Sequence, residues 1–168
     1  MGCPPVFLGL GSNLGDREAA IEGALARLAE RGFQTTLRSS LWLTEPVGGP
    51  PQGWFLNAVA GGETSLTPEA LLEACLATER EMGRVRTVRN GPRTIDLDVL
   101  LFGAQRRDAP GLVLPHPRLA DRRFVLEPLA EIAPGVLHPV IGLTAAELLA
   151  RCPDASVVRR HAPSEAPA

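Results

Sequence analysis

The chain has 168 residues, of which 45% are hydrophobic and 21% are charged, and its formal net charge is −2 at pH 7. This composition predicts one globular domain with a single core, expected over residues 1–158, followed by a polar, disordered tail over residues 159–168. The acidic balance, the 4% aromatic content and the absence of tyrosine disfavour nucleic-acid binding. All 17 basic residues are arginine, which excludes lysine-dependent chemistry.

The cysteines and the first residues indicate the cellular compartment of the protein. Cys3, Cys75 and Cys152 are far apart and have no metal-ligand spacing, so reduced structural thiols are expected. The start of the chain lacks the features of a secretory signal, and no apolar run reaches the length of a membrane span. We therefore expect a cytoplasmic protein, monomeric by default, with neither a membrane nor a nucleic-acid partner.

The first part of the chain alternates between strand and helix patterns. Val6–Leu10 predicts a short strand, and the glycine-rich turn 11–16 leads into a helix that ends near Arg31. The turn matches neither the dinucleotide-binding pattern nor a P-loop, so a helix cap is favoured over a phosphate site. Residues 35–44 are β-like and precede the proline- and glycine-rich stretch 45–53, which predicts an exposed loop.

The next predicted strand, Trp54–Thr64, has an asparagine at its middle. A buried Asn57 must find hydrogen-bond partners. It could bond across to a neighbouring strand or turn, or its amide could contact the edge of a flat ligand that stacks on Phe55. The sequence leaves both alternatives open.

A second helix begins with Thr67 as its N-cap and Pro68 in its first turn. Its expected inner face carries Leu71, Leu72, Cys75, Leu76 and Met82. Glu79 and Glu81, near its end, are expected to be solvated.

The strand predicted from Thr94 to Phe102 is the one around which the chain is organised. Alternation of side chains places Asp96 and Asp98 on one face, with Cα atoms about 6.5–7 Å apart, and the apolar residues on the other. Two like charges this close repel each other, and the repulsion raises the pKa of a carboxyl group unless a cation lies between them. An all-oxygen pair suits magnesium better than zinc.

Four arginines precede this strand without an intervening acidic residue: Arg84, Arg86, Arg89 and Arg93. Glycine, asparagine and proline in the same segment predict a loop. Arginine clamps phosphate oxygens, and carboxylate-held metal neutralises them. The combination favours phosphoryl transfer over the alternative of a solvated basic loop beside an ordinary edge strand.

The last part of the chain is mostly irregular. His116 is fixed between two prolines, which fits a binding contact or a capped surface turn equally well. A short helix is expected from about Arg122 to Pro134, and a capping box at Thr144 starts a last helix that ends near Arg151. From Ser156 onward the chain is expected to be frayed.

The order of elements is strand, helix, strand, strand, helix, strand, followed by short C-terminal elements. This is the split βαβ pattern (βαββαβ) of ferredoxin-like α+β folds. We expect a mainly antiparallel sheet with helices on one face, which leaves the other face for a ligand.

These motifs, in this order, resemble the 6-hydroxymethyl-7,8-dihydropterin pyrophosphokinase family of folate biosynthesis. The matching stretches reach to about Pro134, and they are Gly11–Gly15, Thr44–Gly48, Phe55–Ala58, Gly83–Arg86, Gly91–Asp98 and Leu114–Arg118. The resemblance implies transfer of the β,γ-diphosphate of ATP to the pterin hydroxymethyl group, which gives the pterin diphosphate and AMP. It implies ATP as co-substrate and two Mg²⁺ ions.

The resemblance also implies roles for individual residues. The catalytic residues would be Arg84, Arg93, Asp96 and Asp98, and both aspartates would be magnesium ligands. The pterin would contact Thr44, Val47, Phe55, Asn57, Asp98 and Phe124. ATP would contact Gln52, Glu79, Arg84, Arg86, Arg93, His116 and Arg122.

Two other classes of function compete with this interpretation. A different magnesium-dependent enzyme, such as a nucleotidyltransferase or phosphodiesterase, would share the paired carboxylates but would not explain Phe55, Asn57 and Phe124. A non-catalytic ferredoxin-like ligand-binding module would have no use for the arginine loop. The sequence therefore favours the pyrophosphokinase.

Overall fold

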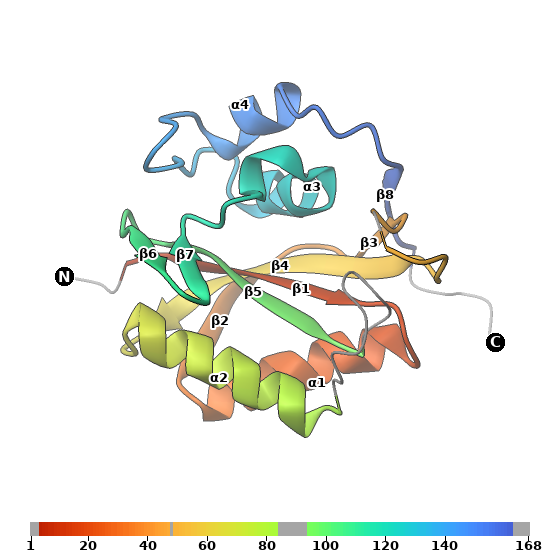
Figure 1. The fold of residues 1–168 in the computed structure, drawn as a ribbon, viewed down its shortest axis with the longest axis horizontal. Coiled ribbons are helices and arrows are strands. Elements are labelled where there is room, and N and C mark those ends of the chain that lie inside the picture. The colour runs from red at the N-terminus through yellow and green to blue at the C-terminus, as the bar shows by residue number, and fades with distance from the viewer. Residues whose placement is uncertain (1–3, 48, 84–93, 163–168) are drawn as a thin grey trace.

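The computed structural model describes residues 4–47, 49–83 and 94–162. A six-stranded sheet forms its centre (Figure 1). The strands are β1 (Val6–Ser12), β2 (Phe33–Arg38), β3 (Trp42–Thr44), β4 (Phe55–Thr64), β5 (Asp96–Phe102) and β8 (Val158–Arg160). Their order is β5-β1-β4-β3-β8, and β2 also pairs with β4. All pairs are antiparallel, so the predicted ferredoxin-like α+β fold is confirmed.

The helices lie in two layers, one on each side of the sheet (Figure 1). One layer contains α1 (Arg17–Glu30) and α2 (Pro68–Glu81), and the other contains α3 (Arg123–Ile132) and α4 (Ala145–Ala150). The remaining elements are a short hairpin of β6 (Arg107–Ala109) and β7 (Leu112–Leu114) and a 3₁₀ turn, η1 (Leu119–Asp121).

The helix starts agree with the sequence. The side chain of Thr67 accepts from the amide of Ala70 and caps α2. Thr144 and Glu147 form the predicted capping box of α4. These caps satisfy backbone amides that have no partner within the helix, which explains why the helices begin where they do.

The expectation that helices cover only one face of the sheet is wrong. Buried side chains form two clusters, one between the sheet and α1 and α2, the other between the sheet and α3 and α4. Along β5, one face carries Asp96 and Asp98 and then Leu100, which is buried against the α3–α4 layer. The sheet face that carries the two aspartates was expected to be open. It is apolar where α3 covers it, at Leu100, and polar where α3 does not, at Asp98 and Asp96.

The expectation that the chain frays from Ser156 is also wrong for the described residues. Val158–Arg160 form β8, which pairs with β3, and the amide of His161 donates to the carbonyl of Leu41 (2.8 Å). The partners lie more than a hundred residues earlier, so local polarity could not reveal them. The boundary at residue 158 stays a prediction, and residues 163–168 lie outside the described ranges.

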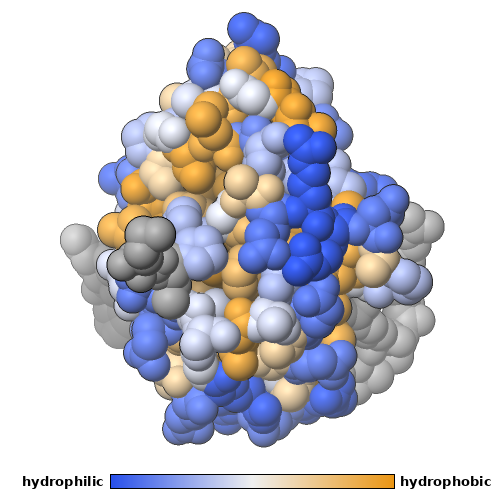
Figure 2. Space-filling view, turned by 90° about the vertical axis from the view of Figure 1, so that its left-hand side faces the viewer, coloured by the Kyte–Doolittle hydropathy of each residue, from blue (hydrophilic) through white to orange (hydrophobic). Residues whose placement is uncertain are grey.

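An apolar patch lies on the connection between α3 and α4, where Leu137, Val140 and Ile141 are exposed. Figure 2 views the side of the molecule that is on the left in Figure 1, and it shows hydrophobic side chains gathered on the upper part of that side. The connection is at the opposite end of the molecule from β8 in Figure 1.

No helix in the described ranges is both long enough and apolar enough to cross a membrane.

Candidate active site

A row of residues across three strands forms the polar part of the sheet face. Asn57 of β4 pairs with Gly11 of β1, and Gly11 pairs with Asp96 of β5. Paired residues of neighbouring antiparallel strands point to the same face, so the amide and the carboxylate share it. A Cβ atom on Gly11 would lie 2.4 Å from Oδ1 of Asn57. The absence of a side chain at Gly11 is therefore what lets Asn57 lie across the strand.

Asn57 is fixed on its other side by a hydrogen bond. Its Nδ2 donates to Oγ1 of Thr44 at 2.7 Å, and both side chains are buried. The cross-strand bond that the sequence allowed for Asn57 is therefore present, and Asn57 also lines a pocket.

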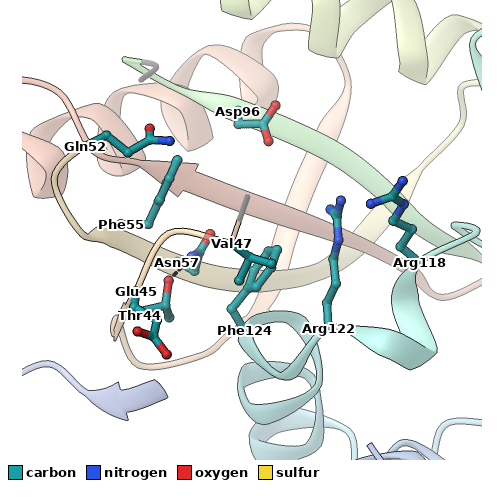
Figure 3. Close-up of a pocket in the computed structure, with 10 residues that line it drawn as sticks. All are labelled: Thr44, Glu45, Val47, Gln52, Phe55, Asn57, Asp96, Arg118, Arg122 and Phe124. Carbon is teal, nitrogen blue, oxygen red and sulfur yellow. Dashed lines mark hydrogen bonds between the residues drawn. The ribbon is translucent and has the colours of Figure 1, made fainter. Parts of the chain in front are cut away.

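The pocket opens between the sheet and the beginning of α3 (Figure 3). It is lined by Thr44, Glu45, Val47, Gln52, Phe55, Asn57, Asp96, Arg118, Arg122 and Phe124. Figure 3 shows Phe55 and Phe124 on opposite sides of Asn57. The structure thus brings together most of the described residues that were expected at a pterin and ATP site. Glu45 and Arg118 were not predicted as site residues. Glu45 directly follows the predicted contact Thr44, and Arg118 lies two residues after the predicted contact His116.

Two arginines contribute positive charge to one side of the pocket. Arg118 and Arg122 extend toward β5 from the segment at the beginning of α3 (Figure 3). The guanidinium carbon of Arg122 is 5.3 Å from the ring centroid of Phe124. This cation–π contact orients both side chains at the edge of the pocket.

The glycine-rich turn after β1 has two functions. Asp16 caps α1 by accepting from the amide of Ala19, as expected. Asn13 is buried, and its Nδ2 donates to Oε1 of Gln52 (2.8 Å) and to the carbonyl of Gly53 (2.9 Å). The turn therefore also anchors the end of the loop that carries Val47 and Gln52, which the sequence did not indicate.

Asp98 lies beside the histidine that is fixed between two prolines. Nε2 of His116 is 3.9 Å from Oδ1 of Asp98, and Nδ1 accepts from the amide of Arg118 at 3.1 Å. Burial lowers the pKa of His116 to about 4; Arg122 and Arg118 act in the same direction and Asp96 opposes them. The ring is therefore neutral at pH 7 with its proton on Nε2. The capped turn is present, and the ring borders the aspartate pair as well.

Glu79 departs from the expectation of a solvated side chain. It is 3% exposed, and its Oε2 accepts from the amide of Leu97 at 2.8 Å. Because β5 is at the edge of the sheet, amides on its outer side need partners from another element. Glu79 thus supports β5 between the two aspartates, and its predicted contact with ATP stays a prediction. Glu81, by contrast, is exposed and forms an ion pair with Arg31.

Cys75 is a structural thiol, as expected. It is fully buried on α2, and burial, together with the charges of Glu79 and Asp98, raises its pKa to about 12. The thiol stays protonated at neutral pH and is not a nucleophile.

The aspartate pair fits a magnesium ion that takes part of its coordination from a substrate. In the described parts of the chain, no three His, Cys, Asp or Glu side chains cluster closely enough to hold a metal by themselves. Magnesium usually takes one or two carboxylates and completes its octahedron with waters and phosphates. Asp96 and Asp98, on one face of β5, supply that donor set. Arg84, Arg86 and Arg93 lie outside the described residues, and their roles stay predictions.

A family model described as 7,8-dihydro-6-hydroxymethylpterin-pyrophosphokinase (HPPK) matches residues 7–134. The chain belongs to this family. The resemblance stated from the sequence motifs is thereby confirmed at the level of the family. The match ends after α3, so α4 and β8 lie beyond it.

Individual relatives agree with this membership. A 2-amino-4-hydroxy-6-hydroxymethyldihydropteridine pyrophosphokinase of Methylorubrum extorquens is 48% identical over 155 residues, which is 91% of this chain and 96% of the relative. A protein of the same name from Pseudomonas aeruginosa is 46% identical over 156 residues, 92% of this chain and 95% of the relative. HPPK members thus match nearly the full length of the chain.

The fold is shared with solved structures at low sequence identity. A Plasmodium falciparum HPPK-DHPS structure with pterin and p-hydrobenzoate superposes with a TM-score of 0.69 at 15% identity. The alignment covers 89% of this chain and 44% of that one, so this chain spans less than half of the Plasmodium protein. The likeness supports the HPPK fold.

Proposed function

We propose that the chain transfers the β,γ-diphosphate of ATP to the hydroxymethyl group of 6-hydroxymethyl-7,8-dihydropterin and releases AMP. The observation that carries this proposal is the row formed by Asn57, Gly11 and Asp96. In this row, an amide suited to a pterin edge and a carboxylate suited to magnesium share one face of the sheet, with one strand between them. Membership of the HPPK family supports the same reaction.

The pterin would occupy the part of the pocket that we call the pterin slot, formed by Thr44, Val47, Phe55, Asn57 and Phe124. A pterin is flat, and its edge carries hydrogen-bond donors and acceptors. Phe55 and Phe124 offer aromatic faces on either side, and Asn57 with Thr44 offers polar atoms between them (Figure 3). Such a site rejects analogues that lack the matching polar edge because its own buried polar groups would then be unpaired.

The triphosphate would lie on the side of the pocket that carries positive charge. Arg118 and Arg122 are described there, and Gln52 lines the same pocket. We assign Arg84, Arg86 and Arg93 to the phosphates as well, on the basis of the family resemblance. The neutral His116 beside Asp98 can donate from Nε2 to a phosphate oxygen without adding charge.

Asp96 and Asp98 would hold two magnesium ions together with phosphate oxygens of ATP. When bound, the metal neutralises phosphate charge as the diphosphate is transferred. The residues of the chain would position the hydroxymethyl oxygen in line with the β-phosphorus, so that a bond between them forms as the bond from that phosphorus to the oxygen of AMP breaks. The hydroxyl proton would go to one of the aspartates or, where polarisation by the bound metal suffices, leave without a protein base. Phosphoryl transfer depends mainly on positioning and charge neutralisation, which arginine and carboxylate side chains supply without lysine.

The test is AMP release from ATP and Mg²⁺, measured with and without 6-hydroxymethyl-7,8-dihydropterin. We expect pterin-dependent AMP in the wild type and a loss of at least about a hundredfold in Asp98→Ala. Asp108→Ala, which removes an exposed aspartate on β6, is the matched control and should keep full activity. Release of ADP or pyrophosphate in place of AMP would contradict the proposed reaction, and pterin binding without AMP formation would contradict catalysis.

A further inference from the structure

The C-terminal segment from Asp154 to His161 crosses from α4 to the edge of the sheet, and we call it the strap. In Figure 1 it passes beside α3 and ends in β8, next to β3. The strap lies beyond the stretch that the family model matches, residues 7–134. Its contacts nevertheless fall on segments that line the pterin slot.

The strap caps the helix that carries Phe124. The N-cap residue of α3 is Arg122, and an arginine side chain has only donors, so it cannot accept from the first amides of the helix. Oδ2 of Asp154 accepts from the amide of Arg123 at 3.0 Å, and its carbonyl accepts from Nε of Arg123 at 3.0 Å. A carboxylate from the strap thus supplies the cap of α3 that the side chain of Arg122 cannot provide.

The strap also fixes the opposite side of the slot. The amide of Val157 donates to Oε1 of Glu45 at 2.6 Å, and its carbonyl accepts from the amide of Glu45 at 3.1 Å. Beyond these bonds, β8 pairs residue by residue with β3, which ends at Thr44. β3 has only three residues, and its pairing with β8 holds Thr44 from the second edge of the strand as well as from β4.

Two arginines of the strap contact aromatic residues around the slot. Arg159 lies 5.7 Å from the ring of Trp54, which directly precedes Phe55. Arg160 lies 5.3 Å from the ring of Trp42, which pairs with Asn57. Each contact falls on a chain neighbour or a cross-strand partner of a slot residue.

We propose that the strap is a positioning element of the pterin slot, which sets the separation between the Phe124 side and the Thr44–Phe55 side. This inference rests on the proposed assignment of the slot to the pterin. The two sides come from different layers of the fold, α3 above the sheet and β3 and β4 within it. The strap is hydrogen-bonded to both, so its loss would let them move relative to each other.

The experiment compares Asp154→Ala and Arg159→Ala with the wild type in the full-length chain. The readouts are the Kd of 6-hydroxymethyl-7,8-dihydropterin at saturating non-hydrolysable ATP analogue and Mg²⁺, and the KM of each substrate. We expect the pterin Kd and KM to rise about five- to tenfold in Asp154→Ala and the KM of ATP to change less than about twofold. Arg159→Ala should change the same parameters in the same direction by a smaller factor.

Two further variants separate positioning from a general loss of stability. Asp154→Asn keeps an oxygen that can accept from the amide of Arg123 and should recover most of the pterin affinity. Arg38→Ala removes an exposed arginine from β2, where it pairs with Ala60 of β4 and forms an ion pair with Glu22, and should leave both KM values unchanged. All assays are run well below the melting temperature of each variant.

Phe124→Ala distinguishes failure of this inference from failure of the slot assignment. If Phe124→Ala leaves the pterin Kd unchanged, the slot does not bind the pterin and the inference falls with it. If Phe124→Ala weakens pterin binding but Asp154→Ala does not, the strap has no positioning role. Equal increases in the KM of pterin and of ATP in Asp154→Ala would also overturn the proposal.

Discussion

Gly11 shows how a single missing side chain shapes the site. Asn57 and Asp96 come from strands that do not pair with each other, and the strand between them contributes no side chain at this position. The carboxamide of Asn57 occupies the space where a Cβ of Gly11 would be. A glycine that the sequence marked as part of a helix-leading turn is therefore also a steric requirement of the pocket.

Gly11→Ala is expected to displace the Asn57 side chain, because its methyl group would lie 2.4 Å from Oδ1. We expect pterin affinity to fall about tenfold or more, since the hydrogen bond between Asn57 and Thr44 would be lost or distorted. Calorimetric titration of the pterin in the presence of an ATP analogue measures this loss. Gly135→Ala, which adds a methyl group in open space, is the control. Wild-type affinity in Gly11→Ala would show that Asn57 is not a pterin contact.

At the scale of elements, Glu131 joins α3 to β3 and β8. Its carboxylate accepts from the amide of Ser40 (3.0 Å), from Oγ of Ser40 (2.6 Å) and from Nε1 of Trp42 (3.0 Å). Arg160 adds an ion pair at 3.4 Å. Burial alone would raise the pKa of Glu131, but the hydrogen bonds from Ser40 and Trp42 and the charge of Arg160 outweigh it and lower the pKa.

This lowered pKa gives stability a defined pH dependence. Because the folded pKa lies below the ordinary value of 4.5, the charged form is favoured in the folded state. Its stabilisation is fully present above that ordinary value and is lost as the pH falls through the folded pKa. Because Glu131 is exposed and solvent screens its charge, we expect the difference in unfolding free energy between wild type and Glu131→Gln to be at most about 1 kcal/mol at pH 7 and to shrink below about pH 4.5.

Urea denaturation of both proteins between pH 7 and pH 3.5 checks this expectation. Glu63→Gln, at an exposed position on β4, serves as the control for loss of one carboxylate. A difference between wild type and Glu131→Gln that stays constant over the whole range would contradict the linkage to Glu131.

Elements with local signals could be predicted from the sequence, and elements with distant partners could not. The starts of α2 and α4 were predictable because Thr67 and Thr144 cap amides three residues away. The burial of Glu79 was not, since it depends on the edge position of β5, and β8 was not, since its partner is β3. The same division holds within the site. Asp96 and Asp98 follow from strand alternation, whereas the pocket position of Arg118 requires the fold.

At the scale of the whole molecule, α3 connects the second buried cluster to the slot. Leu126, in α3, is completely buried between the helix layer and the sheet, and Phe124 is two residues earlier. Leu28 is equally buried in the cluster on the opposite side of the sheet. The two leucines are thus equally buried, but only Leu126 lies on the helix that carries the slot residue Phe124.

Leu126→Ala and Leu28→Ala are each expected to lower the unfolding free energy by about 2–5 kcal/mol, because each leaves a cavity in a packed cluster. Only Leu126→Ala should also weaken pterin binding at a temperature where both variants are folded, since it loosens the helix that carries Phe124. Urea denaturation and pterin titration measure the two effects separately. Equal pterin affinities in the two variants would contradict a structural link between this cluster and the slot.

The second helical layer has a consequence for the substrate. One face of β5 changes within a few residues from Leu100, which α3 covers, to Asp98 and Asp96, which it does not. In the site proposed here, a pterin in the slot would continue the covering layer from the point where the protein ends it, and the substrate would act as a removable part of the core. Each turnover would then uncover and cover part of the central sheet, and we expect the resistance of the fold to unfolding to rise with the concentration of the pterin.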